Sequence, residues 1–141
     1  MLHFIYPLRT ISDNATIGEK IAFYRKKRNL LSNDLANLVG IDRVTMIRYE
    51  NNQMDCPYEI IVKIIEVLNV DKHLLMDEYL TFIDYPYSIF VKEKRKLLKL
   101  KQYELGEMVG VNRRQIEKWE HGACMITRER YQKLKEIQFV P

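Results

Sequence analysis

Apolar residues recur along this chain at the three- and four-residue intervals of helices that bury one face. The clearest stripe has i, i+3, i+4, i+7 spacing and consists of Ile61, Ile64, Ile65 and Leu68. Farther upstream, Thr16 and Glu19 have the spacing of a capping box, which opens a helix. The pattern of apolar and polar positions therefore predicts an all-α fold.

The helical pattern occurs twice, 70 positions apart and without a gap. Residues 25–43 align with residues 95–113, and both copies continue to an aromatic residue followed by glutamate. The matched positions are Arg25/Arg95, Leu30/Leu100, Leu35/Leu105, Val39/Val109, Gly40/Gly110, Ile41/Val111, Arg43/Arg113, Met46/Ile116 and Glu50/Glu120. We therefore expect two copies of one helical unit.

Each copy contains a short helix, a glycine turn and a second, capped helix. In the first copy the short helix covers residues 34–39, Gly40 takes the left-handed turn position, and Asp42 caps the next helix. A fourth helix starts at Pro57 in copy one and at Thr127 in copy two, and only copy one has a short fifth helix. The apolar positions assigned to these helices include Ile17, Ile21, Tyr24, Met46, Tyr49, Leu74, Leu75, Phe90, Val91, Leu98, Leu105, Met108 and Val109.

These signals divide the chain into four parts. We expect an arm over residues 1–15, a domain of about five helices over 16–78, a connector over 79–86, and a domain of about four helices over 87–141. The connector is apolar and aromatic, so it either lies buried between domains or in a dimer, or packs under the first helix of copy two. The arm, with its apolar residues 2–8, can pack on the connector or exchange with a partner chain.

The charge of the chain is concentrated in its second half. The full sequence has 23 basic and 19 acidic residues and a net charge of +4. Residues 81–141 alone hold thirteen basic and eight acidic residues, a net charge of +5. This excess favours an anionic partner, of which nucleic acid is the usual example.

Both copies resemble the phage repressor/Cro-like helix-turn-helix family. The resemblance rests on a short helix ending in Leu-x-x-x-Val-Gly, and on a capped second helix ending in an aromatic residue and glutamate. It covers residues 16–78 and 87–137. It implies sequence-specific binding to double-stranded DNA by a transcriptional regulator, a repressor in preference to an activator. In this family the helix after the turn enters the major groove.

The resemblance also implies roles for individual residues. The positions implied to read bases are Arg43, Val44, Arg48, Arg113, Arg114 and Lys118. Arginine suits this role because its fork can bridge O6 and N7 of guanine. The positions implied to contact phosphate or to support reading are Ser32, Thr45, Asn51, Asn52, Lys101, Gln102, Gln115 and His121.

Two arginine–glutamate pairs are also implied, and they would orient the recognition helices. They are Arg25 with Glu50 and Arg95 with Glu120, each pair 25 positions apart, and plain surface charges are the alternative interpretation. Both copies depart from the family at the cap of the second helix, which carries Leu31 or Lys101 in place of Ser or Thr. If only one copy reads DNA, the basic second copy is favoured.

Other function classes find less support in the sequence. An enzyme is not expected, since no nucleophile with a base, no phosphate-binding glycine loop and no paired carboxylates stand out. The main alternative is a protein-interaction module, such as an antitoxin-like or antirepressor protein, that uses the same fold. Discriminating the two requires a DNA-binding assay.

Cofactors and membranes are not indicated either. Cys56 and Cys124, with His121 near the second, fall short of a four-ligand metal site. The apolar run over 60–68 is interrupted by charges and is too short to span a bilayer. We therefore expect a cytoplasmic protein with no cofactor and no small-molecule substrate, whose partner is double-stranded DNA. The sequence leaves the oligomeric state open, with a homodimer as one of the alternatives.

Overall fold

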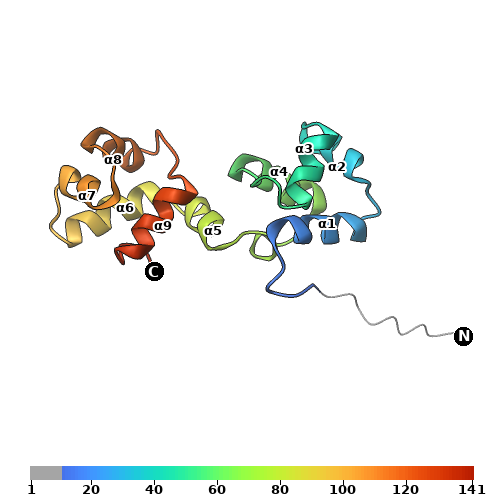
Figure 1. Ribbon diagram of the computed structural model, residues 1–141, viewed down its shortest axis with the longest axis horizontal. Coiled ribbons are helices and arrows are strands. Elements are labelled where there is room, and N and C mark those ends of the chain that lie inside the picture. Colours follow the sequence, from blue (N-terminus) through green and yellow to red (C-terminus); the bar gives the residue numbers. More distant parts are fainter. Residues whose placement is uncertain (1–10) are drawn as a thin grey trace, which may run out of the picture. The chain divides into compact units, whose positions relative to one another are not determined.

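The structure is a computed structural model that describes residues 11–141, and within this range every regular element is a helix (Figure 1). The predicted all-α fold class is therefore confirmed. The chain forms two compact units, of which the first ends at Asp77 and the second runs from Glu78 to Pro141. Most of the predicted arm, residues 1–10, lies outside the described residues.

The first unit contains four α-helices and a short 3₁₀ helix. Its elements are α1 (Ile17–Lys27), α2 (Ser32–Val39), α3 (Arg43–Glu50), α4 (Tyr58–Leu68) and η1 (Lys72–Leu74). The Thr16 hydroxyl accepts a hydrogen bond from the Glu19 backbone at 3.1 Å and opens α1. The core consists of fully buried side chains from all four α-helices and from the residue after η1, and it includes Ile21, Leu35, Met46, Ile61, Ile64, Leu68 and Leu75.

The second unit repeats the first four helices and adds one before them. Its elements are α5 (Glu78–Asp84), α6 (Tyr87–Leu97), α7 (Gln102–Val109), α8 (Arg113–Glu120) and α9 (Arg128–Glu136). Trp119 belongs to its core, with 1% of its surface exposed, and Phe139 and Val140 after α9 are also buried. In the first unit, Leu75 and Met76 after η1 are buried, and in the second unit Leu80 and Ile83 of α5 are buried as well as the tail.

The predicted connector over residues 79–86 is largely a helix of the second unit. Leu80 and Ile83, three positions apart on α5, are buried. The Tyr79 hydroxyl donates a 2.6 Å hydrogen bond to the Ile126 carbonyl, and the Phe82 and Tyr131 rings lie 5.1 Å apart. The segment therefore packs against residues of copy two.

Both glycine turns have the geometry that their sequences predict. Gly40 and Gly110 have φ angles of 82° and 77°, in the left-handed region where a Cβ is unfavourable. The caps that follow are made, since Asp42 accepts from the Thr45 backbone at 2.7 Å and Asn112 from the Gln115 backbone at 2.8 Å. The start of each recognition helix is therefore fixed by local chemistry.

Several apolar positions differ from expectation. Leu74, Leu98 and Met108 are 44–48% exposed, whereas the sequence pattern predicts them on the buried faces of their helices. In α7 the buried face is formed by Leu105, Gly106 and Val109, which leaves position 108 on its flank. Leu98 caps α6 beyond its last buried turn, and the predicted fifth helix of copy one is only the three-residue η1. Pro57 precedes α4 as its cap instead of occupying its first turn.

Candidate nucleic-acid interface

The two recognition helices, α3 and α8, each bury one face and expose the other. In α8 the buried side chains are Ile116, Trp119 and Glu120; in α3 they are Met46 and Tyr49. The six positions implied to read bases, Arg43, Val44, Arg48, Arg113, Arg114 and Lys118, are all exposed. Each recognition helix therefore exposes cationic side chains at the implied reading positions. In copy one, the apolar Val44 occupies one of its three positions.

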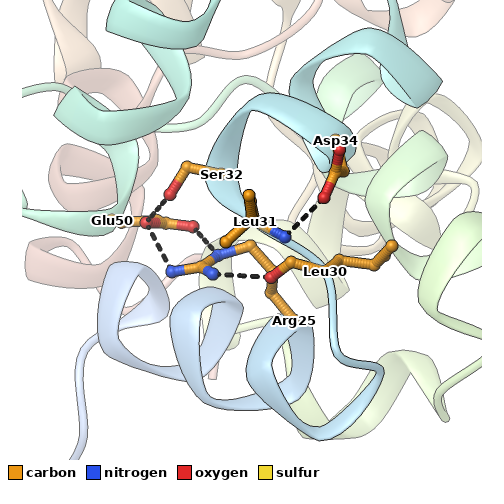
Figure 2. A network of polar contacts seen from close by, with 6 residues as sticks. All are labelled: Arg25, Leu30, Leu31, Ser32, Asp34 and Glu50. Carbon is orange, nitrogen blue, oxygen red and sulfur yellow. Dashed lines mark hydrogen bonds and ion pairs between the residues drawn. The ribbon is translucent and has the colours of Figure 1, made fainter.

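A buried polar network fixes the end of α3 (Figure 2). Arg25 Nε lies 2.5 Å from Glu50 Oε1, and Arg25 Nη2 donates to Glu50 Oε2 at 3.2 Å. Arg25 Nη1 donates to the Leu30 carbonyl at 2.8 Å, and Ser32 Oγ donates to Glu50 Oε2 at 3.0 Å. One carboxylate thus joins α1, the start of α2 and the end of α3.

The same network occurs in copy two. Arg95 Nε lies 2.7 Å from Glu120 Oε2, and Arg95 Nη2 donates to Glu120 Oε1 at 2.9 Å. Gln102 Nε2 donates to the same carboxylate at 3.4 Å, and Arg95 Nη1 donates to the Leu100 carbonyl at 2.8 Å. The two predicted arginine–glutamate pairs therefore lie in contact and are not separate surface charges.

The charges of the copy-two pair shift both pKa values in the direction of ionisation. Burial alone would raise the pKa of Glu120, but hydrogen bonds from Arg95 and Gln102 outweigh it and lower the pKa below its usual range. The hydrogen bond to Glu120 in turn raises the pKa of Arg95. The pair is therefore charged at neutral pH, and it anchors the carboxyl end of α8 to α6.

Ser32 and Gln102, which the resemblance implies at phosphate, make hydrogen bonds within the protein. Each donates to the glutamate that closes its recognition helix. The side chains of Leu31 and Lys101 do not cap α2 and α7. The Asp34 carboxylate accepts a hydrogen bond from the Leu31 backbone N–H at 2.8 Å, and the Glu104 carboxylate accepts one from the Lys101 backbone N–H at 2.9 Å. An acidic residue three positions after the cap makes one of the two hydrogen bonds of a capping box. Asp34 and Glu104 are therefore the features of the sequence that could have predicted these bonds.

The remaining supporting positions fall into two groups. Asn51, Asn52, Lys101 and His121 are exposed beside their recognition helices. Thr45 and Gln115 instead make internal bonds, Thr45 Oγ1 to Asp42 Oδ2 at 3.0 Å and Gln115 Nε2 to Cys124 Sγ at 3.3 Å. Hydrogen bonds from Thr45 lower the pKa of Asp42.

Two structural residues were missed by sequence reasoning. Gly18 on α1 is buried against the carboxyl end of α3, where an added Cβ would lie 2.2 Å from the Tyr49 carbonyl oxygen. Arg130 on α9 donates from Nη1 to the Val109 carbonyl at 3.1 Å, at the turn that precedes α8. Neither has a counterpart of the same type in the other copy, so the internal repeat gave no signal for them.

Comparisons with known proteins agree with this geometry. A family model described as a helix-turn-helix domain matches residues 18–80, and a second one described as helix-turn-helix matches residues 91–136. No curated protein and no solved structure matches the chain. Among the described residues, none of the helices has the length and apolar character needed to cross a membrane, and no cluster of potential metal ligands is found.

Proposed function

We propose that this protein, which belongs to the repressor/Cro-like helix-turn-helix family through both of its domains, binds specific sequences of double-stranded DNA and represses transcription. DNA-binding regulation is the general function of such domains. The sequence specificity, the repressor activity and the cytoplasmic location are our proposals. The observation that supports specific DNA binding is the repeated network in which a buried carboxylate fixes a capped helix with exposed cations.

The reading mechanism follows from the position of the cations on α8. Arg113 and Arg114 occupy its first turn, which in this fold is the end that enters the major groove. Arg113 Nη2 lies 3.9 Å from Glu117 Oε2, and both side chains are exposed, so this weak contact does not hold the guanidinium back. Each arginine can then bridge O6 and N7 of a guanine, a contact that discriminates by about 1–3 kcal/mol.

The two copies are unequal in this mechanism. Copy two carries three cations at the implied reading positions, whereas copy one has Val44 between Arg43 and Arg48. Asp42, which caps α3, adds a negative charge where copy two has the neutral Asn112. We infer that copy two contributes more of the binding free energy, and that one chain prefers an asymmetric site.

A specific feature of copy one favours the alternative, a protein-interaction role for that domain. Leu31, Leu38 and Val44, on or beside α2 and α3, are 56–70% exposed. A partner protein could cover these apolar side chains. In that case copy one docks to protein while copy two binds DNA.

The test is duplex binding by the full chain across a range of salt concentrations. We expect affinity to fall steeply with salt, because each phosphate contact releases counterions. Arg114→Ala should weaken binding roughly tenfold. The control Lys133→Ala, which removes an exposed charge of α9, should change it less than about twofold. Binding that is independent of salt and of Arg114 would contradict the DNA function and favour the protein-interaction role.

The roles of the copies are separated by the corresponding changes in copy one. If Arg43→Ala and Arg48→Ala leave duplex affinity unchanged while the copy-two changes abolish it, copy one is not a DNA reader. If the copy-two changes are silent, our assignment of the stronger contribution is wrong. A sizing column with and without DNA tests for the homodimer in the same samples.

A further inference from the structure

A cleft of about 450 Å³ lies in the second unit, on the flank of α8. Its walls are the α7–α8 turn, the first turn of α9 and the loop between α8 and α9. The cleft is separate from the exposed face of α8 that carries the reading cations, since none of Arg113, Arg114 and Lys118 lines it. We propose that this cleft binds an oxyanion, of the phosphate type, with Arg130 as the main ligand.

Arg130 is held in place to do this. Its side chain is half-buried and lines the cleft, and its Nη1 donates to the Val109 carbonyl at 3.1 Å. A guanidinium has five N–H donors in a planar fork, so one bond to the backbone fixes the group and leaves the other donors for a ligand. A fixed arginine binds an oxyanion without paying to order its own side chain.

The rest of the lining also favours a negative ligand. The lining includes no aspartate or glutamate, and Glu129, the nearest carboxylate along α9, is exposed and does not line the cleft. Asn112 and Thr127 use their side-chain oxygens to accept backbone N–H groups at 2.8 and 3.2 Å. The amide N–H₂ group of Asn112 and the hydroxyl hydrogen of Thr127 can therefore act as hydrogen-bond donors. Together with the Arg130 guanidinium, such donors suit a ligand whose atoms accept hydrogen bonds, as the oxygens of an oxyanion do.

The first copy lacks these features, which makes it an internal control. At the repeat offset of 70, Arg130 corresponds to Ile60, which has no charge, and Asn112 corresponds to Asp42, a carboxylate. The same fold is therefore built without the cation and with a negative charge at the helix cap. An oxyanion site in copy two alone goes beyond the DNA-reading role proposed for both copies.

The volume of the cleft exceeds what one phosphate fills and lies within the range of small-ligand sites. Two sources share the required chemistry, a sugar-phosphate of the DNA backbone beside α8 and a free phosphorylated small molecule. Anion binding itself does not depend on the proposed DNA function. The second source would add an effector that the sequence did not suggest.

The single tryptophan of the chain, Trp119, lines the cleft and reports ligand entry directly. Its emission is recorded while inorganic phosphate or ribose 5-phosphate is added to the full chain, against chloride at equal ionic strength. We expect a saturable change for the phosphates only. Arg130→Gln should raise the half-saturating concentration about tenfold, and Lys133→Gln, a loss of the same charge on the same helix, less than about twofold.

A second variant guards against misfolding of Arg130→Gln. Asn112→Asp keeps the cap, because Asp42 caps α3 in the same way, but it puts a carboxylate in the cleft. We expect Asn112→Asp to keep the helical circular dichroism of the wild type and to lose at least about tenfold in phosphate affinity. Phosphate binding that this variant leaves unchanged would contradict the proposal.

Duplex binding identifies the source. If the backbone of DNA occupies the cleft, Arg130→Gln should reduce the slope of log affinity against log salt concentration by about the amount that one phosphate contact contributes. Lys133→Gln should leave this slope unchanged. If a free ligand occupies it, the phosphate titration depends on Arg130 and the salt dependence does not. If Arg130→Gln and Lys133→Gln give the same results in the phosphate titration and in duplex binding, the proposal is overturned, even if the chain binds DNA.

Discussion

The buried carboxylate of Glu120 is predicted to stabilise the second unit, and Glu120→Ala tests this most directly. The side chain is 3% exposed and accepts three hydrogen bonds, two from Arg95 and one from Gln102. Its removal leaves the Arg95 guanidinium, itself only 12% exposed, without a counter-charge. Losing one partner of a buried ion pair costs about 3–5 kcal/mol.

We expect the lower end of this range, about 3 kcal/mol, because Arg95 retains its hydrogen bond to the Leu100 carbonyl. For a unit of this size, that cost corresponds to a fall in melting temperature of roughly 12–24 °C. The change should be smaller when both charges are removed together, as in Arg95→Met with Glu120→Leu, since no unpaired charge is then buried.

Thermal unfolding followed by Trp119 emission is the appropriate assay, because the only tryptophan lies in the second unit. Glu117→Ala on the same helix is the control. Its partner Arg113 lies 3.9 Å away, both side chains are exposed, and such a pair contributes less than about 1 kcal/mol. Equal melting temperatures for Glu120→Ala and Glu117→Ala would refute the orienting role of the buried pair.

Three further predictions concern stability. The folded-state pKa of Glu120 lies below its ordinary value of 4.5, so the stabilisation by its carboxylate is complete above pH 4.5 and is lost as the pH falls through the lowered pKa. In urea unfolding at pH 7 and at pH 3, the free energy of unfolding should therefore fall more for the wild type than for Glu120→Gln. Gly18→Ala should destabilise the first unit by ~1–3 kcal/mol, because the new Cβ meets the Tyr49 carbonyl at 2.2 Å; unchanged tyrosine circular dichroism and melting would contradict this. Leu80→Ala on α5 should destabilise the unit that Trp119 reports by ~2–5 kcal/mol, and an unaltered Trp119 transition would mean that α5 does not belong to that core.

The local features were predictable from the sequence because each depends on a few neighbouring residues. Thr16, Asp42 and Asn112 cap the helices that follow them, and Gly40 and Gly110 take the left-handed turn. Because the pattern is repeated, each helix predicted in one copy could be compared with the aligned residues of the other copy. The arginine–glutamate contacts were accessible only through the resemblance, since two charges 25 positions apart carry no local signal.

The features that were missed depend on tertiary partners. The hydrogen bonds from Ser32 and Gln102 to the closing glutamates could not be predicted, because sequence positions alone cannot show that a buried glutamate lies within reach. The segment over 79–86 has no aligned counterpart in the repeat, so its helix and its core could not be checked against a second copy. The cleft beside Arg130 depends on a cation that only copy two carries, so the internal repeat gives no signal for it.

Selection of bound duplexes from a random pool, carried out in parallel with wild type and Arg114→Ala, tests the central claim most directly. We predict that the wild type enriches one asymmetric motif with a guanine-containing half, and that Arg114→Ala relaxes preference at one or two positions of that half. A pool that shows no enriched motif with the wild type, or the same motif with both proteins, would contradict base reading by α8.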